Sequence, residues 1–380
     1  MTYLDHNATS PLRPEAAAAM ARAGGNPSSV HAQGRSARAV VEEARDAVAK
    51  LVGSRVEEVI FTSGGTEANA HALYGAVHGA LEAEARITRI FVSAIEHKSV
   101  LATAAAIGER VAGVRVAEIP VTADGVVDVE ALRVLLREGK GRALVCVMAA
   151  NNETGVIQPL DAIAKHVRDA GALLLVDAVQ AAGKIALDVD ADYLTLSGHK
   201  FGALTGTGAL IVKDGAPFAP LVAGGGQERG RRAGTENVAG IASLGAAASV
   251  VAKRDDIARQ TALRDRFESE MLRRWPETIV FGARSPRLHN TSNFALPGVT
   301  AETAMMALDL DGVMVSSGSA CSSGKVKPSH VLQAMGVSEE TALRGLRVSF
   351  GWNSKDTDVD AVLASVGKLV ARASLARAAA

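Results

Sequence analysis

The sequence predicts an α/β protein with a central, mostly parallel sheet and a second, smaller α/β domain. Short apolar runs alternate with segments of helical periodicity through the first two thirds of the chain, as in α/β units around a parallel sheet. The 380 residues, of which 48% are hydrophobic, suffice for a large core and two domains.

Seven apolar runs predict the strands of the central sheet. They are Val59–Phe61, Ile90–Val92, Val114–Ile119, Leu144–Val147, Leu173–Val176, Tyr193–Leu196 and Ala209–Val212. Helices between them are predicted where apolar residues recur every three or four positions: Ser36–Val52, Asp128–Glu138 and Asp161–Ala170. A glycine directly follows each of these helices, as is common at helix ends.

After about Val251 the pattern changes. A charged helix (Asp255–Arg274) precedes short strands around Asn293–Leu296 and Leu346–Phe350, and a last helix begins at Asp356. We therefore expect residues 14–252 to form the large domain and residues 253–380 to belong to the small one.

Composition excludes several classes of protein. The 41 basic and 41 acidic residues balance, so no general attraction to nucleic acid or to an anionic membrane is expected. Two cysteines exclude a disulfide framework, and we expect no metal site. The N-terminus has no signal-peptide pattern, and the uncharged stretch Asn237–Ala252 is too short to span a membrane. A cytoplasmic protein is expected.

Polar residues follow five of the predicted strands. These segments are Thr62–Glu67, Glu96–Lys98, Asn151–Gly155, Asp177–Gln180 and Ser197–Lys200. In open parallel sheets, ligands bind beyond the carboxyl ends of the strands. The side chains of these segments are therefore expected to converge on one site.

Each of these residues also has a plain structural interpretation. Asp177, directly after a buried strand, is either a ligand-binding carboxylate or half of a structural ion pair, and Lys200 is either reactive or a solvated loop charge. His97 is either a catalytic group or a satisfied histidine. The turn Thr62–Thr66, which includes Gly65, is either a strand-to-helix turn with a capping residue or a phosphate-binding turn. Together, however, the amine, the carboxylate and a phosphate-binding turn fit pyridoxal phosphate, which needs all three.

The two cysteines have different surroundings in the sequence. Cys146 lies within the strand Leu144–Val147 and is expected to be a small core residue. Cys321 lies in a run of small residues with little to bury, which favours a reactive thiol. Arg347, in an alternating strand, is interpreted either as an exposed edge-strand residue or as a bidentate clamp for a carboxylate.

Two glycine-rich parts of the sequence resemble nucleotide-binding motifs but do not match them. Gly318–Lys325 has one residue too many between its glycines for a P-loop, and Val326 stands where Ser or Thr would bind magnesium. The glycines at 206–208 and 224–226 lack the strand–turn–helix context of a dinucleotide fingerprint.

A set of short motifs resembles the cysteine desulfurases of the NifS/IscS type, in the family's order and over nearly the whole chain. They occupy residues 3–9, 26–31, 61–67, 96–99, 151–155, 177–180, 197–200, 224–229, 231–237, 319–324 and 327–330. The resemblance implies a homodimeric pyridoxal-phosphate enzyme of the class V aminotransferase group, with the three-layer fold called fold type I. It also implies that residues 1–13 join the small domain.

The resemblance assigns roles to residues at the matching positions. Lys200 would carry the cofactor, Asp177 would hold its pyridine nitrogen, Gln180 would meet its phenolic oxygen and His97 would stack on its ring. Its phosphate would be held by Thr66, Ser197 and His199, with Thr235 reaching the phosphate in the partner subunit. Arg347 and Asn152 would bind the substrate carboxylate, and Cys321 would receive the sulfur.

The implied reaction converts L-cysteine into L-alanine and leaves a persulfide on Cys321. That sulfur would pass to an acceptor or scaffold protein, for iron–sulfur cluster assembly or other sulfur trafficking. A selenocysteine lyase or an aminotransferase of the same fold is the alternative. A non-catalytic sulfur carrier that keeps the fold is a further one, although such a protein would have lost Lys200, Asp177 or Cys321.

Overall fold

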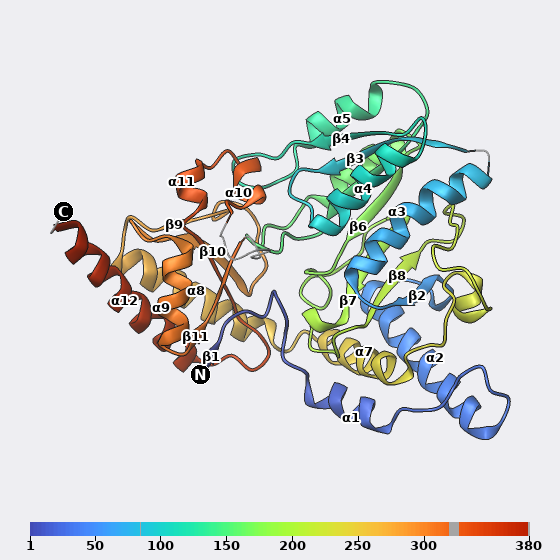
Figure 1. Cartoon of the computed structure of the whole chain (residues 1–380), viewed down its shortest axis with the longest axis horizontal. Coiled ribbons are helices and arrows are strands. Elements are labelled where there is room, and N and C mark those ends of the chain that lie inside the picture. The colour runs from blue at the N-terminus through green and yellow to red at the C-terminus, as the bar shows by residue number, and fades with distance from the viewer. Residues whose placement is uncertain (84, 319–326, 379–380) are drawn as a thin grey trace.

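A seven-stranded sheet forms the centre of the larger part of the molecule in the computed structural model, which describes residues 1–83, 85–318 and 327–378 (Figure 1). Its order is β2-β8-β7-β6-β5-β3-β4. The strands are β2 (Val59–Thr62), β3 (Ile87–Ser93), β4 (Arg115–Ile119), β5 (Arg142–Met148), β6 (Leu173–Asp177), β7 (Tyr193–Ser197) and β8 (Gly208–Val212). The pairs from β7 to β4 are parallel, whereas β8 is antiparallel to both neighbours. The predicted, mostly parallel sheet is confirmed.

Helices cover both faces of this sheet, which gives three layers. Successive residues of β5 enter different cores: Val145 and Val147 lie in one, Leu144 and Cys146 in the other. The first core includes residues of α1 (Pro14–Arg22), α2 (Ala32–Val52), α5 (Val129–Arg137), α6 (Leu160–Asp169) and α7 (Val238–Val251). The second includes residues of α3 (Gly65–Glu82) and α4 (Lys98–Arg110). Cys146 is buried, as predicted.

The smaller part of the molecule contains a four-stranded antiparallel sheet of order β12-β13-β10-β9. Its strands are β9 (Ile279–Val280), β10 (Thr291–Ala295), β12 (Ser316–Ser317) and β13 (Gly345–Ser349), and β1 (Thr2–Tyr3) pairs separately with β11 (Val313–Met314). The helices are α8 (Ile257–Arg274), α9 (Ala301–Leu310), α10 (His330–Ala334), α11 (Glu339–Ala342) and α12 (Asp356–Ala378).

This part has its own apolar core. Phe267 of α8, Phe294 of β10 and Val362 of α12 pack in it, together with Leu4 from the N-terminal strip. The prediction that residues 1–13 and 253–380 form one domain stays a prediction, and the place of Leu4 in this core supports it.

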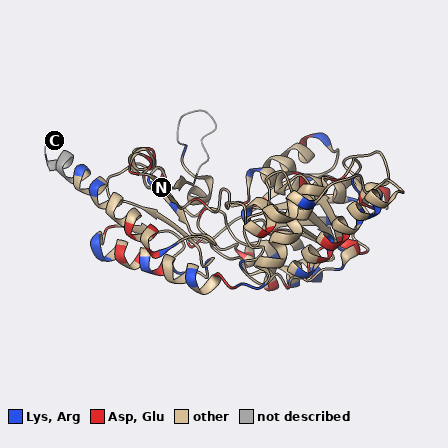
Figure 2. Ribbon diagram, turned by 90° about the horizontal axis from the view of Figure 1, so that it is seen from below, with Lys and Arg blue, Asp and Glu red and all other residues tan. Residues whose placement is uncertain are grey.

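Two lobes lie side by side in Figure 2, and the N-terminus lies at the smaller lobe. Basic and acidic residues are interspersed over both lobes (Figure 2), in line with the balanced composition. No helix in the described part of the chain has the length and apolar character needed to cross a membrane.

Candidate active site

A cavity of about 560 Å³ lies beyond the carboxyl ends of the central strands, against the smaller lobe. The predicted site residues that line it are Gly65, Thr66, His97, Asn152, Asp177, Gln180, Ser197, His199, Lys200 and Arg347. Arg347 comes from β13 of the small sheet, so both lobes contribute to the cavity. Thr235 does not line it and is exposed just before α7, and Cys321 lies outside the described residues.

Asp177 ends β6 and is buried, with an exposed fraction of 5%. Its Oδ1 accepts a hydrogen bond from the Val179 backbone N–H at 2.9 Å, and its Oδ2 accepts one from Asn69 Nδ2 at 2.8 Å. Burial raises the pKa of Asp177, although these donors and the nearby His97 and Lys200 oppose the shift. A positive group in the cavity would stabilise the ionised carboxylate.

Lys200 follows β7 in a short 3₁₀ turn, Gly198–Lys200. Its Nζ donates to the backbone carbonyls of Asn7 at 2.8 Å and Ala8 at 2.9 Å. Burial, and secondarily the charge of Arg347, lowers the pKa of Lys200 to about 8. The amine is therefore much closer to its neutral, nucleophilic form near neutral pH than an ordinary lysine is.

The N-terminus of α3 borders the cavity at Gly64–Thr66. Gly64 has φ = 153°, a conformation open to glycine. A Cβ on Gly65 would lie 2.7 Å from Val179 Cγ2, so any side chain there would force Val179 to move. The first N–H groups of an α-helix have no partner within the helix, and they favour an anion. This end of the cavity thus suits a phosphate.

His97 and His199 are held in neutral form beside the cavity. His97 caps α4, and its Nδ1 accepts a hydrogen bond from the Ser99 backbone N–H at 3.1 Å. Burial lowers the pKa of His97, and it lowers the pKa of His199 to about 4. The Nδ1 of His199 lies 3.0 Å from Thr9 Oγ1. Neutral imidazoles can stack on a ring or share hydrogen bonds without adding charge.

Arg347 is buried, with an exposed fraction of 5%, and β13 has neighbours on both sides. The alternative of an exposed edge-strand arginine is therefore wrong. Its Nη1 donates to the Asn152 carbonyl at 2.8 Å and its Nη2 to Asp5 Oδ1 at 2.7 Å. Its Nε has no hydrogen-bond partner among the described residues. A buried donor left unsatisfied in this way favours a ligand with acceptor oxygens.

Sequence reasoning missed Asn7 and Lys184 as residues that organise this site. The Asn7 carbonyl accepts from both Lys200 Nζ and Gln180 Nε2, each at 2.8 Å. Lys184 Nζ donates to Gln180 Oε1 at 3.1 Å and to Asn7 Oδ1 at 3.2 Å. These contacts turn the Gln180 amide so that its oxygen faces Lys184. The sequence pointed to Asn7 only through the motif at residues 3–9, and it gave no indication of Lys184.

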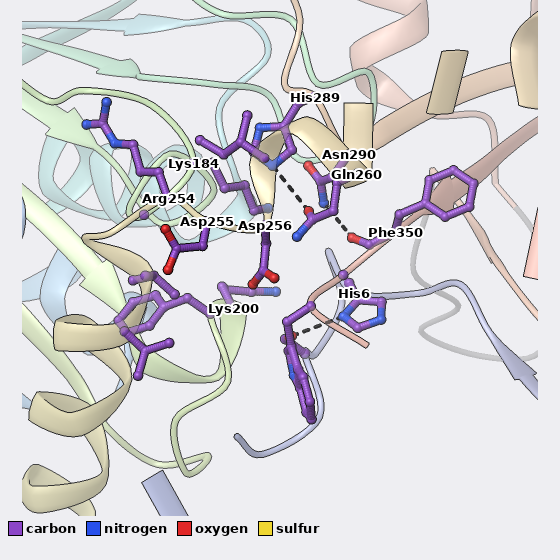
Figure 3. Close-up of a pocket in the computed structure, with 18 of the residues that line it drawn as sticks. His6, Lys184, Lys200, Arg254, Asp255, Asp256, Gln260, His289, Asn290 and Phe350 are labelled. Carbon is purple, nitrogen blue, oxygen red and sulfur yellow. Dashed lines mark hydrogen bonds between the residues drawn. The ribbon is translucent and has the colours of Figure 1, made fainter. Parts of the chain in front are cut away.

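A smaller cavity, of about 160 Å³, also touches Lys200 (Figure 3). His6, Lys184 and His289 contribute to its wall. Burial lowers their pKa values to about 3, 7 and 4 respectively. His6 and His289 are therefore neutral near pH 7 and Lys184 is only partly protonated there, which limits the positive charge that these three groups place next to the Lys200 amine.

The lowered pKa of Lys200 gives a testable pH dependence. Attack of its amine on an aldehyde needs the unprotonated form, so a folded-state pKa of about 8 makes the reaction rate rise until about pH 8 and then level off. An ordinary lysine would keep gaining rate up to about pH 10.4. The measurement is the rate at which the apoprotein regains visible absorbance with pyridoxal phosphate, as a function of pH. A rate still rising steeply above pH 9 would contradict the assignment.

The amine, the buried carboxylate and the anion-binding helix end lie in one cavity of an α/β protein, the arrangement of a pyridoxal-phosphate enzyme. The chain belongs to the class-V aminotransferase family, which matches residues 2–362. Enzymes of this family use pyridoxal phosphate, and the residues present fit it.

Comparison with known proteins shows similarity to one kind of enzyme within this family. The chain is 44% identical to a cysteine desulfurase of Cereibacter sphaeroides, covering 95% of this chain and 93% of that protein. It is 41% identical to an IscS-like cysteine desulfurase of Mycobacterium tuberculosis, covering 100% and 99%. A solved NifS-like protein from Rickettsia africae superposes with a TM-score of 0.86 at 32% identity, covering 97% of this chain and 99% of that one.

Proposed function

We propose that this protein is a pyridoxal-phosphate-dependent cysteine desulfurase that converts L-cysteine into L-alanine and passes the sulfur through Cys321 to an acceptor. The observation that carries the proposal is the single cavity that joins Lys200, Asp177 and Arg347. The full-length similarity to cysteine desulfurases supports the substrate. A selenocysteine lyase or an aminotransferase is not favoured, because the relatives are named for desulfurase activity.

Pyridoxal phosphate supplies an aldehyde that condenses with the substrate amine and a ring that accepts the electron pair released at the substrate Cα. Lys200 would hold the cofactor and then take the Cα proton, a role that its pKa of about 8 suits. Asp177, fixed by Asn69 and Val179, would hold the ring nitrogen. Gln180 and His97 would contact the phenolic oxygen and the ring face.

The sulfur step would need a thiolate at Cys321. Its sulfur attacks the substrate sulfur, so an S–S bond forms while the Cβ–S bond of the substrate breaks. The electron pair of the broken bond stays on the carbon side, where two protons complete alanine. The net reaction, cysteine plus thiol to alanine plus persulfide, balances without an external oxidant.

Two further parts of the proposal concern partners. A homodimer would bring Thr235 of one subunit to the cofactor phosphate of the other, in keeping with its exposed position outside the cavity of its own chain. A sulfur acceptor or scaffold protein would then remove the persulfide sulfur, for iron–sulfur cluster assembly or another pathway. The cytoplasmic location stays a prediction from the sequence.

The test of the activity is to incubate the holoenzyme with L-cysteine and measure alanine, protein persulfide and, after reductant, sulfide. Alanine and sulfur should form in equal amounts, with the persulfide mapped to Cys321 by mass spectrometry. Selenocysteine and keto acids serve as alternative substrates. Faster turnover of selenocysteine without a Cys321 persulfide would favour a lyase, and keto-acid consumption would favour an aminotransferase.

Arg347→Lys should weaken the binding of L-cysteine more than it slows the reaction. A lysine cannot keep the contacts to Asn152 and Asp5 while also presenting two parallel donors to a carboxylate. We expect KM to rise by about tenfold or more, with a smaller change in kcat. Arg344→Lys, at an arginine outside the cavity, is the matched control. An unchanged KM in Arg347→Lys would remove the clamp role.

A further inference from the structure

Glu153 is a buried carboxyl group in the turn after β5, with an exposed fraction of 2%. The turn is built by Asn151, whose Oδ1 accepts hydrogen bonds from the backbone N–H groups of Glu153 and Thr154, both at 2.9 Å. Asn151 Nδ2 is tied to the Ile95 carbonyl at 3.1 Å. These contacts fix the backbone of the turn that carries Glu153 relative to the large sheet.

The Glu153 carboxylate meets two points of the chain that are distant from it in sequence. Its Oε2 accepts a hydrogen bond from Ser329 Oγ at 2.5 Å. The same Oε2 occupies the space that a Cβ on Gly318 would need, so the carboxylate packs directly against that backbone. Residues 318 and 329 stand on either side of Cys321 in the sequence.

Both contact points are themselves anchored. Gly318 follows β12, whose residues Ser316 and Ser317 pair with β13. Ser329 caps α10, because its Oγ accepts from the Leu332 backbone N–H at 3.2 Å. The carboxylate therefore joins the end of a strand, the start of a helix and a turn of the large sheet.

Packing alone does not explain a carboxyl group here. Burying a carboxylate is unfavourable unless it is well bonded, and burial raises the pKa of Glu153 to about 7 against the opposing effects of Ser329, Arg347 and Lys98. Glu153 does not line the cofactor cavity. The carboxyl group contributes two contacts at this position: the hydrogen bond to Ser329 and the packing against Gly318.

We propose that Glu153 is a positioning residue for sulfur transfer, whose carboxylate holds Gly318 and Ser329 and so fixes the two points between which the chain carries Cys321. The inference rests on the proposed function, since it assumes that Cys321 takes the substrate sulfur. It predicts that changes at Glu153 slow the sulfur step without weakening substrate binding.

The experiment uses holoenzyme mixed with L-cysteine. The change in visible absorbance reports substrate binding, and intact-protein mass spectrometry reports the rate of persulfide formation. Glu153→Ala should slow persulfide formation by about tenfold or more and leave the cysteine concentration for half-maximal absorbance change within about twofold. Glu153→Gln, whose amide oxygen can still accept from Ser329, should restore most of the rate.

Ser329→Ala and Ser338→Ala form a matched pair. Both remove the side-chain cap of a short helix, since Ser338 Oγ accepts from the Thr341 backbone N–H at 3.3 Å, but only Ser329 bonds to Glu153. Ser329→Ala should slow persulfide formation several-fold and Ser338→Ala should not. In the Glu153→Ala background, Ser329→Ala should add little, because the bond it removes is already gone.

Ser329→Ala also covers the case in which Glu153→Ala does not fold, because Ser329 lies outside the cofactor cavity. It removes the hydrogen bond to Glu153, so the sulfur step should slow while cysteine still binds. Wild-type persulfide rates in Glu153→Ala, or a parallel loss of cysteine binding, would overturn the inference. A wild-type enzyme that forms alanine but no Cys321 persulfide would instead overturn the proposed function.

Discussion

Lys200→Ala is expected to lower the rate of alanine formation by about 10³-fold or more, the contribution of a general base combined with that of the amine that holds the cofactor. Lys200 is the only lysine among the described residues that line the main cavity. The variant should also fail to retain cofactor that borohydride can fix covalently to the chain. Intact-mass spectrometry after reduction measures this directly.

Variants of two other lysines test the assignment of Lys200 as the residue that binds the cofactor covalently. Lys165→Ala removes an exposed lysine that pairs with Asp169 on α6, and it should keep both activity and covalent fixation. Lys184 is the nearest alternative, because it lines the smaller cavity beside Lys200. If borohydride still fixed the cofactor in Lys200→Ala but not in Lys184→Met, Lys184 would be the reactive amine and the present assignment would fail.

The central sheet was predictable because its inner strands are buried on both faces. Leu144–Met148 and Leu173–Val176 are continuous apolar runs, and the structure places alternate residues of β5 in two separate cores. Such runs are typical of parallel strands covered by helices. The position of the site followed from the same pattern. The carboxyl ends of parallel strands meet at one edge of the sheet, so polar residues that directly follow these strands gather there.

The contacts across the site were not predictable from local pattern. Asn7 contacts Lys200 and Gln180, which are 193 and 173 positions away in the sequence. A local sequence pattern does not predict contacts over such separations. The alternation around Arg347 likewise did not distinguish an edge strand from a central one, because that depends on which strands pair with β13. Partners of this kind are set by tertiary packing.

Cys321→Ser should abolish protein persulfide and lower alanine formation by about 10²-fold or more, because a hydroxyl at neutral pH is a far weaker nucleophile toward sulfur than a thiolate. Cofactor binding should be unchanged, since Cys321 is not among the residues expected to hold the cofactor, and all of those except Thr235 line the described cavity. The absorbance change on adding L-cysteine should therefore persist in the variant. Persulfide is measured by mass spectrometry and alanine by its release.

Cys146→Ala is the matched control, and it separates the two thiols. Cys146 belongs to β5 and its side chain is buried in one of the two cores beside the central sheet, where burial raises the pKa of the thiol well above the usual value and disfavours the thiolate. Cys146→Ala should keep the sulfur step and lose on the order of 1 kcal/mol of unfolding free energy from the small cavity it leaves. Persulfide formation that survives in Cys321→Ser but disappears in Cys146→Ala would reverse the roles of the two cysteines, and with them the proposed route of the sulfur.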